Sequence, residues 1–224
     1  MPWLNASARP TDPHMTASIV YLHGFRSSPR SFKAQLLGKR MASVGLADHY
    51  VCPTLPVSPR EAMAEVEALI ADLSTREGAK PVLIGSSLGG YYATWLAERH
   101  GLRAAMLNPA TRPERDLAKY VGEQPLWHGG GTIRVEPHHL DELRVLAVPA
   151  VTQLDRYYLL ASTGDEVLDY REMLAHFPGA TTRVIGGSDH GISDFAQYMD
   201  EVLVFCGVPA DLLAAHPFNG DALA

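Results

Sequence analysis

The chain has 224 residues, of which 46% are hydrophobic, so it is long enough to form one globular domain with a sizeable core. Lys and Arg total 19 against 25 Asp and Glu, the formal net charge is -6 and no basic run occurs, which argues against nucleic acid as a partner. Cys52 and Cys206 are the only cysteines and lie far apart, which indicates reduced thiols and a cytoplasmic location. Neither a signal peptide nor an apolar run of roughly 18 residues occurs, so we expect a soluble protein without a membrane span.

Short apolar runs alternate with segments of helical periodicity along the chain. The runs that we expect as strands cover residues 18–22, 50–55, 81–85, 103–108, 156–162 and 181–185. The expected helices cover about 30–44, 61–73, 88–100, 166–176 and 192–205. In the first helix Phe32, Leu36, Leu37 and Met41 recur at helical spacing, and Gly45 stands where a C-terminal cap is expected. Because parallel crossovers place helices on both faces of a sheet, the alternation predicts an α/β fold with a mostly parallel central sheet.

The domain boundaries follow from the same pattern. Residues 1–16 contain three prolines and no regular apolar period, and we expect a flexible leader there. We assign residues 17–207 to a single domain and residues 208–224 to a C-terminal tail. Within the domain, an irregular insert of about residues 113–154 is interpreted as a small lid. Its histidines, His128, His138 and His139, show no spacing typical of metal ligands, so no metal is expected.

A Gly-x-Ser-x-Gly motif, Gly85-Ser86-Ser87-Leu88-Gly89, joins an expected strand to an expected helix. This context is typical of a nucleophile elbow, in which a strained turn exposes a serine hydroxyl above the sheet. The alternative is a Gly- and Ser-rich connection without catalytic function. The strand-to-helix context favours Ser87 as a nucleophile.

A serine nucleophile needs a base and an acid that orients it, and both candidates follow later strands. His190 lies in a glycine-rich loop after the last expected strand, and Asp165 follows the strand before it. Asp165 could equally cap the next helix. The order Ser, Asp, His, with each residue placed after a strand, is that of the α/β-hydrolase fold, so we predict a triad of Ser87, Asp165 and His190. Weaker candidates for the acid are Asp189, Asp194 and Glu166.

The loop after the first strand, His23-Gly24-Phe25, stands where this fold supplies one donor of the oxyanion hole. We expect the backbone N–H groups of Phe25 and Leu88 to be the two donors, with that of Arg26 as an alternative to Phe25. His23, Gly24, Arg26 and Ser27 are candidates for contact with the substrate, although Arg26 could equally be a solvated surface charge.

Four blocks of the sequence are more specific than the Gly-x-Ser-x-Gly motif alone. They are His23-Gly24-Phe25-Arg26-Ser27-Ser28-Pro29, Gly85-Ser86-Ser87-Leu88-Gly89-Gly90-Tyr91-Tyr92-Ala93, Asn108-Pro109-Ala110 and Thr163-Gly164-Asp165-Glu166-Val167-Leu168-Asp169-Tyr170. Together they resemble the YqiA-type small esterase family of α/β-hydrolases. The resemblance covers about residues 18–206 and implies a cytoplasmic esterase without cofactor that acts on acyl esters, or on acyl-CoA thioesters. The same residues, Ser87, Asp165 and His190, fall on the triad positions. One departure is Arg26, since Asn is frequent at that position in such proteins.

We therefore expect a serine esterase with a small-molecule acyl substrate. An acyltransferase or thioesterase with the same triad is the alternative among enzymes, because the first half-reaction is shared. A non-catalytic binding protein that keeps the hydrolase fold is the alternative from another class. The sequence leaves a monomer and a homodimer equally open.

Overall fold

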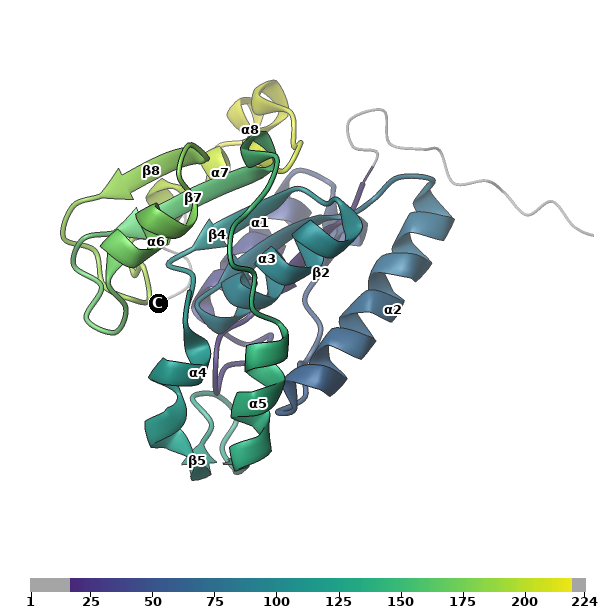
Figure 1. Ribbon diagram of the computed structural model, residues 1–224. Coiled ribbons are helices and arrows are strands. Elements are labelled where there is room, and N and C mark those ends of the chain that lie inside the picture. Colours follow the sequence, from purple (N-terminus) through teal and green to yellow (C-terminus); the bar gives the residue numbers. More distant parts are fainter. Residues whose placement is uncertain (1–16, 219–224) are drawn as a thin grey trace, which may run out of the picture.

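The computed structural model describes residues 17–218, which fold around one six-stranded sheet (Figure 1). The order of the strands is β2-β1-β3-β4-β7-β8, and every neighbouring pair runs parallel. The bounds are Ile19–Leu22 for β1, Tyr50–Val51 for β2, Val82–Ser86 for β3, Ala104–Leu107 for β4, Tyr157–Ser162 for β7 and Thr181–Ile185 for β8. The fold is therefore the three-layer α/β architecture that the alternation predicts.

The central strands are buried on both faces, which explains their continuous apolar sequences. Along β1, Val20 and Leu22 pack into the core on one face of the sheet, whereas Ile19 and Tyr21 pack into the core on the other. This alternation follows from the two-residue period of a strand. The sheet thus separates two hydrophobic cores.

Helices cover each face of the sheet. On one face lie α2 (Pro59–Glu77), α3 (Leu88–His100) and α6 (Tyr170–His176), and on the other lie α1 (Phe32–Ser43), α7 (Met199–Phe205) and α8 (Ala210–Ala215) (Figure 1). Short 3-10 turns at Ala47–His49, Ala118–Tyr120, Leu154–Arg156 and Phe195–Gln197 complete the connections. Gly45, just past the end of α1, has φ +80°, the left-handed conformation expected of a helix-ending glycine.

The buried face of α1 differs from the expected stripe. Phe32 is 41% exposed, whereas Lys33 and Arg40, seven residues apart, are buried. The Arg40 guanidinium donates to both carboxylate oxygens of Asp200, in the first turn of α7. It also donates to the carbonyl oxygens of Leu213 and His216. A buried guanidinium is tolerated because these acceptors use its donors. Arg40 therefore ties α1 to α7 and α8.

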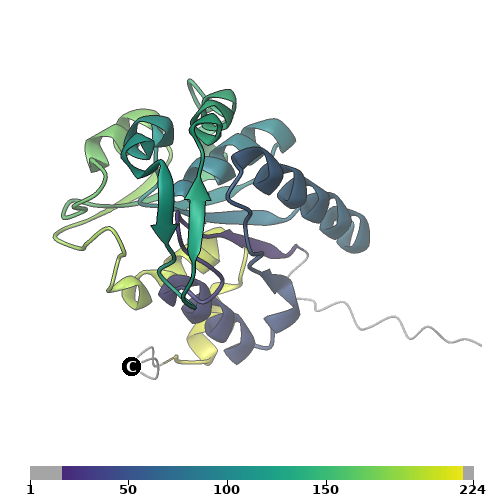
Figure 2. The same ribbon diagram turned by 90° about the horizontal axis from the view of Figure 1, so that it is seen from below.

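The expectation of an irregular insert is wrong. Residues 113–154 contain α4 (Pro113–Asp116), α5 (Pro137–Val145) and a hairpin of β5 (Gly122–Pro125) and β6 (Thr132–Val135), which pair antiparallel. Figure 2, seen from below, shows this hairpin in the foreground. Its strands are short and mostly polar, so their sequence lacks a clear apolar alternation. A glycine run, Gly129-Gly130-Gly131, with positive φ at each residue, lies in the turn between them.

Two predicted helices start later than expected. The helix predicted over 166–176 begins at Tyr170, because Asp169 caps it by accepting the N–H of Arg171. The helix predicted over 192–205 begins at Met199, after a 3-10 turn over Phe195–Gln197. In both cases the loop before the helix belongs to the site described below.

The structure describes the two ends of the chain only in part. The leader expected over residues 1–16 lies outside the described residues. The segment assigned to a C-terminal tail, 208–224, begins with Val208 and α8, and Val208 and Leu213 are buried in the core beside α1 and α7. Residues 219–224 lie outside the described part. Among residues 17–218, no helix combines the length and the apolar character needed to cross a bilayer.

Candidate active site

The predicted site residues meet at one edge of the sheet. Because all neighbouring strands run parallel, the carboxyl ends of β1, β3, β4, β7 and β8 lie along the same edge. Along the chain, β2 is added on one side of β1 and β3 on the other, so the direction of strand addition reverses between β1 and β3. In open α/β sheets, ligands bind in the crevice at such a reversal. His23 follows β1 and Ser87 follows β3, so both lie beside this crevice.

Ser87 occupies a strained turn between β3 and α3. Its backbone has φ 55° and ψ -121°, a conformation that residues other than glycine rarely adopt. The flanking glycines are required by contact: a Cβ at Gly85 would lie 2.4 Å from Gly89 O, and one at Gly89 would lie 1.9 Å from Leu22 O. The motif therefore allows α3 to start directly against the ends of β1 and β3.

Ser87, His190 and Asp165 form a chain of hydrogen bonds. His190 Nε2 lies 3.0 Å from Ser87 Oγ, and His190 Nδ1 lies 2.7 Å from Asp165 Oδ2. The Asp165 side chain is fully buried, whereas that of His190 is 21% exposed. A proton on Nδ1, held by the carboxylate, leaves Nε2 free to accept the proton of the hydroxyl.

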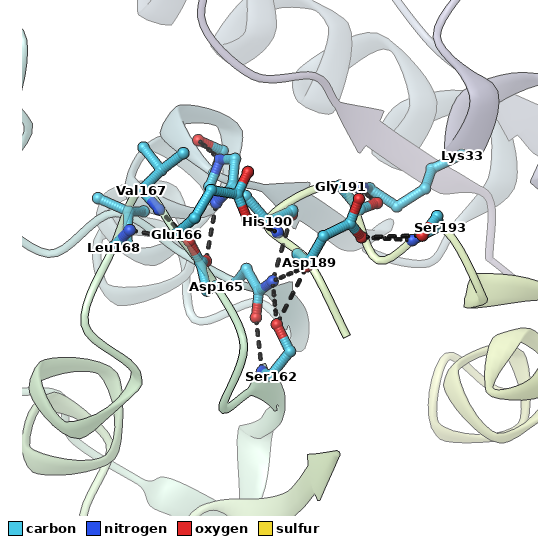
Figure 3. Close-up of polar contacts among 12 residues, drawn as sticks. Lys33, Ser162, Asp165, Glu166, Val167, Leu168, Asp189, His190, Gly191 and Ser193 are labelled. Atoms are coloured by element: carbon cyan, nitrogen blue, oxygen red, sulfur yellow. Dashed lines mark hydrogen bonds and ion pairs between the residues drawn. The ribbon is translucent and has the colours of Figure 1, made fainter. Parts of the chain in front are cut away.

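Backbone groups hold the Asp165 carboxylate in place. Its Oδ1 accepts the N–H groups of Val167 and Leu168, both at 2.8 Å, and Figure 3 shows these groups directed at the carboxylate. The N-cap alternative for Asp165 is thus not the geometry observed, since the helix starts only at Tyr170. Glu166 contributes differently, because its Oε2 accepts the backbone N–H of His190.

The other acid candidates point elsewhere. Asp189 Oδ1 accepts the N–H and the hydroxyl of Ser193, and these hydrogen bonds hold the pKa of Asp189 below its ordinary value. Asp194 accepts the hydroxyl of Ser188. In the described part of the chain, Asp165 is the carboxylate bonded to the His190 ring.

Asn108, which belongs to one of the four blocks that resemble the esterase family, also lies beside the predicted site. It is fully buried at the end of β4 with φ +42°. Its Nδ2 donates to Ser162 Oγ at 2.8 Å and to the carbonyl oxygens of Asp189 and His190, each at 3.2 Å, while its Oδ1 accepts Ser162 N–H at 2.8 Å. Asn108 therefore joins β4, the end of β7 and the loop that carries His190.

The loop after β1 lies against Ser87. A Cβ built on Gly24 would be 3.2 Å from Ser87 Cβ and 3.7 Å from Ser87 Oγ, so the backbone itself approaches the serine. Among the hydrogen bonds of residues 17–218, none uses the N–H of Phe25 or of Leu88 as donor. Leu88 is the first residue of α3, where such free N–H groups are expected. Within residues 17–218, both N–H groups therefore lack a hydrogen-bond acceptor.

His23 faces the protein interior. It is 5% exposed, its Nδ1 lies 3.1 Å from Gly24 O, and its Nε2 lies 3.3 Å from the N–H of Leu55. A donor at Nδ1 and an acceptor at Nε2 match the neutral ring. Burial is the main reason that the pKa of His23 lies below its ordinary value. These contacts support the loop, and His23 also lines the smaller of the two cavities described below.

Arg26 connects the same loop to the hairpin. Its Nε donates to Pro125 O at 2.5 Å, its guanidinium lies 4.1 Å from the ring centroid of Trp127, and Trp127 N–H donates to Arg26 O. Residue 26 has φ +59°, a conformation that Asn tolerates better than Arg. Ser27 closes the turn by donating its N–H to Gly24 O. Arg26 is thus neither a free surface charge nor directed only at a substrate.

Two cavities meet at this loop. The larger, about 530 Å³, contains Ser87 and His190 and is bounded on one side by Leu117, Tyr120 and Trp127 of the insert. The smaller, about 70 Å³, lies between Phe25 and Leu88 and the insert, and its wall is mainly apolar. The insert contributes Leu126, Ile133, Val135, Leu140 and Leu143 to that wall. Among residues 17–218, no group of three His, Cys, Asp or Glu side chains could hold a metal ion.

Comparison with solved structures defines the class of fold. The chain is similar to the esterase domain of a Rhodothermus marinus protein (TM-score 0.59, 21% identity, 87% of each chain covered). It is similar to the metagenome-derived lipolytic enzymes LipS and LipT (0.64, 18%, 86% of this chain and 94% of that one). It is also similar to mouse alpha/beta hydrolase domain-containing protein 10 (0.61, 17%, 85% and 91%). The fold is that of the α/β-hydrolases.

The family follows from the sequence match. The model of the family described as "Uncharacterised protein family (UPF0227)" matches residues 18–207, and this chain belongs to that family. The resemblance to YqiA-type small esterases is thereby confirmed.

Proposed function

We propose that this protein is a serine esterase that hydrolyses carboxylic esters through an acyl-enzyme on Ser87. The observation that carries the proposal is the unbroken hydrogen-bonded chain from Ser87 Oγ through His190 to the buried Asp165 carboxylate. The descriptions of two similar structures, as an esterase domain and as lipolytic enzymes, support the same class of reaction.

The reaction begins when Ser87 Oγ attacks the acyl carbon. His190 Nε2 takes the hydroxyl proton, and Asp165 stabilises the imidazolium that forms. The tetrahedral oxyanion lies at the free N–H groups of Phe25 and Leu88, whose positions are set by the close approach of Gly24 and by the start of α3.

The tetrahedral intermediate collapses when the bond to the leaving oxygen breaks. His190 gives its proton to that oxygen, so the alcohol departs neutral and the acyl group stays on Ser87. Water then attacks the acyl carbon while His190 takes its proton. The bond from the acyl carbon to Ser87 Oγ breaks, His190 returns the proton to Ser87 Oγ, and the carboxylic acid is released. A thioester would pass through the same acyl-enzyme with a thiol as leaving group.

The cavities suggest how the two parts of the ester are held. The small apolar cavity next to Phe25 and Leu88 suits the acyl chain, because apolar walls favour the burial of hydrocarbon. The insert of residues 113–154 then acts as a cap, since its hairpin and α5 form much of that wall.

The test combines a covalent probe with turnover. Wild type and Ser87→Ala are treated with a fluorophosphonate and weighed by intact mass, and hydrolysis of p-nitrophenyl esters of graded chain length is measured. Ser74→Ala, a serine on α2 remote from the site, is the matched control. We expect an adduct on wild type and on Ser74→Ala only, and a fall in kcat of about 10³-fold or more for Ser87→Ala.

Two results would reject the proposal. Near-native turnover by folded Ser87→Ala would remove Ser87 from the chemistry. A wild type that neither labels nor hydrolyses any ester would make the protein a binding protein with a hydrolase fold.

A further inference from the structure

Lys33 is a buried cation beside the proposed catalytic residues that the mechanism does not use. It lies in the first turn of α1, is 8% exposed, and lines the same cavity as Ser87 and His190. Its Nζ donates to the carbonyl oxygen of Gly191, the residue after His190, and Figure 3 shows the side chain reaching that loop. The lysine therefore lies on the His190 side of the cavity.

The ammonium group has donors to spare. Of its three N–H bonds, one is directed at Gly191 O, and within residues 17–218 no carboxylate forms an ion pair with it. Asp189 and Asp165 attract it from a distance. Both oxygens of Asp165 are held by His190 and by neighbouring backbone N–H groups, and Oδ1 of Asp189 is held by Ser193. Burial lowers the pKa of Lys33 to about 8, so the group is still mostly charged at neutral pH. An incompletely paired buried charge is costly for a fold that does not use it.

Three hydroxyl groups line the cavity on the same side of the sheet. Tyr21 lies on the α1 side of β1, and the cavity is lined by Tyr21, Ser31 and Ser86. Within residues 17–218, the buried Ser31 Oγ has no hydrogen-bond partner. Ser31 is the N-cap residue of α1, yet its side chain does not bond to the helix N–H groups. The floor of the cavity thus offers hydroxyl donors and the amino end of a 12-residue helix together with the ammonium group.

The charge on the cavity wall is positive, although the whole chain carries a net charge of -6. Arg26, Lys33 and Lys119 line it against one carboxylate, that of Asp116. Asp116 is paired with Arg115 Nε at 2.8 Å, although Arg115 also pairs with Glu172. Three cations therefore line the cavity against one partly neutralised carboxylate. The field inside therefore favours an anionic group.

From this arrangement we propose that Lys33, with the hydroxyls of Tyr21, Ser31 and Ser86, forms a subsite for a carboxylate on the alcohol portion of the ester. The placement on the alcohol portion follows from one contact and from the lining of the apolar cavity. Lys33 donates to the carbonyl oxygen of Gly191, the neighbour of His190, and His190 must reach the leaving oxygen. The apolar cavity is lined by Phe25 and Leu88 and by neither Lys33 nor His190. The inference rests on the proposed esterase function and names the substrate class: esters of hydroxy acids.

The test compares matched esters on matched variants. The substrates are 4-acetoxybenzoate and its neutral amide, 4-acetoxybenzamide. The variants are Lys33→Met, and Lys39→Met as a control at an exposed position of the same helix. We expect Lys33→Met to lower the ratio of kcat/KM for the acid to kcat/KM for the amide by about 10-fold or more, as loss of a charge-assisted hydrogen bond implies, on top of any fall common to both esters. Lys39→Met should change neither.

A purely structural lysine gives another result. If Lys33 only anchors the Gly191 carbonyl, Lys33→Met lowers kcat/KM for both substrates by the same factor, and the subsite is refuted. Equal values before and after the substitution refute it as well. A preference for a carboxylate on the acyl portion alone, measured with p-nitrophenyl hemisuccinate against p-nitrophenyl butyrate, refutes its placement.

A binding measurement separates this inference from the esterase proposal. Calorimetry with 4-hydroxybenzoate and 4-hydroxybenzamide needs no turnover, and the wild type alone suffices if Lys33→Met does not fold. We expect the wild type to bind the carboxylate at least about 10-fold more tightly than the amide. Tighter binding of the carboxylate without fluorophosphonate labelling would support the subsite and reject the esterase proposal. Fluorophosphonate labelling together with equal affinity for 4-hydroxybenzoate and 4-hydroxybenzamide would support the esterase proposal and reject the subsite.

Discussion

Replacement of Asn108 by Ala should weaken the fold and the reaction together. The substitution removes three hydrogen bonds from Nδ2 and leaves the buried N–H of Ser162 without an acceptor. An orphaned buried N–H costs about 1 to 3 kcal/mol, and the lost bonds to acceptors cost about 1 kcal/mol each or less. Ala at φ +42° adds about 1 kcal/mol of backbone strain. We expect the free energy of unfolding to fall by about 3 to 5 kcal/mol.

The same bonds position His190, so the rate should fall in protein that is still folded. Loss of the contact to the His190 carbonyl frees the loop, and a displacement of about 1 Å costs roughly 100-fold in rate. We expect kcat for p-nitrophenyl acetate to drop by about 10- to 100-fold, measured well below the unfolding midpoint.

Urea unfolding followed by circular dichroism gives the free energies, and Asn108→Gly is the matched variant. Gly adopts a positive φ without strain, so it should recover about 1 kcal/mol of the loss in Asn108→Ala while the rate stays low. A stability of Asn108→Ala within about 1 kcal/mol of wild type, together with a normal kcat, would refute this account of the residue.

Two further outcomes concern the loop after β1. Gly89→Ala should lower the free energy of unfolding by more than about 3 kcal/mol or abolish folding, because its Cβ would lie 1.9 Å from Leu22 O. Gly186→Ala, with nothing within 4 Å of its Cβ, is the control, and equal effects of the two substitutions in urea unfolding would contradict the steric argument. The pKa of His23 lies below the ordinary 6.5 in the folded state, so the unfolded chain binds more protons near pH 6. The contribution of His23 to the free energy of unfolding is therefore complete above pH 6.5 and is lost as the pH falls below 6.5. His23→Gln should flatten the dependence of the free energy of unfolding on pH, measured by urea unfolding. An unchanged pH dependence in His23→Gln would contradict this assignment.

The features that the sequence determined by itself are those of local pattern. Apolar runs indicated every strand of the main sheet, although the weaker run over 50–55 forms a strand only at Tyr50–Val51. Helical spacing followed by a glycine indicated α1, which ends at Ser43, just before Gly45. The turn around Ser87 could be predicted because there is no room for a Cβ atom at Gly85 or Gly89, so the motif requires glycine at both positions. The weakly patterned hairpin at 122–135 was missed, since strands with little burial carry no strong alternation.

The tertiary structure decided which side chains meet across the sheet. Asp165, Asp189 and Glu166 are equivalent as carboxylates near the end of a strand, and only the packing of β7 against β8 places Asp165 at the His190 ring. Lys33 falls on the inner face of α1, but its nearness to the Gly191 loop depends on a contact 158 residues away in sequence. Arg26 and Trp127 meet in the same way, over long separation. Local sequence determines the elements because hydrophobic period and turn chemistry act over a few residues, whereas contacts between distant loops depend on how the strands are ordered in the sheet.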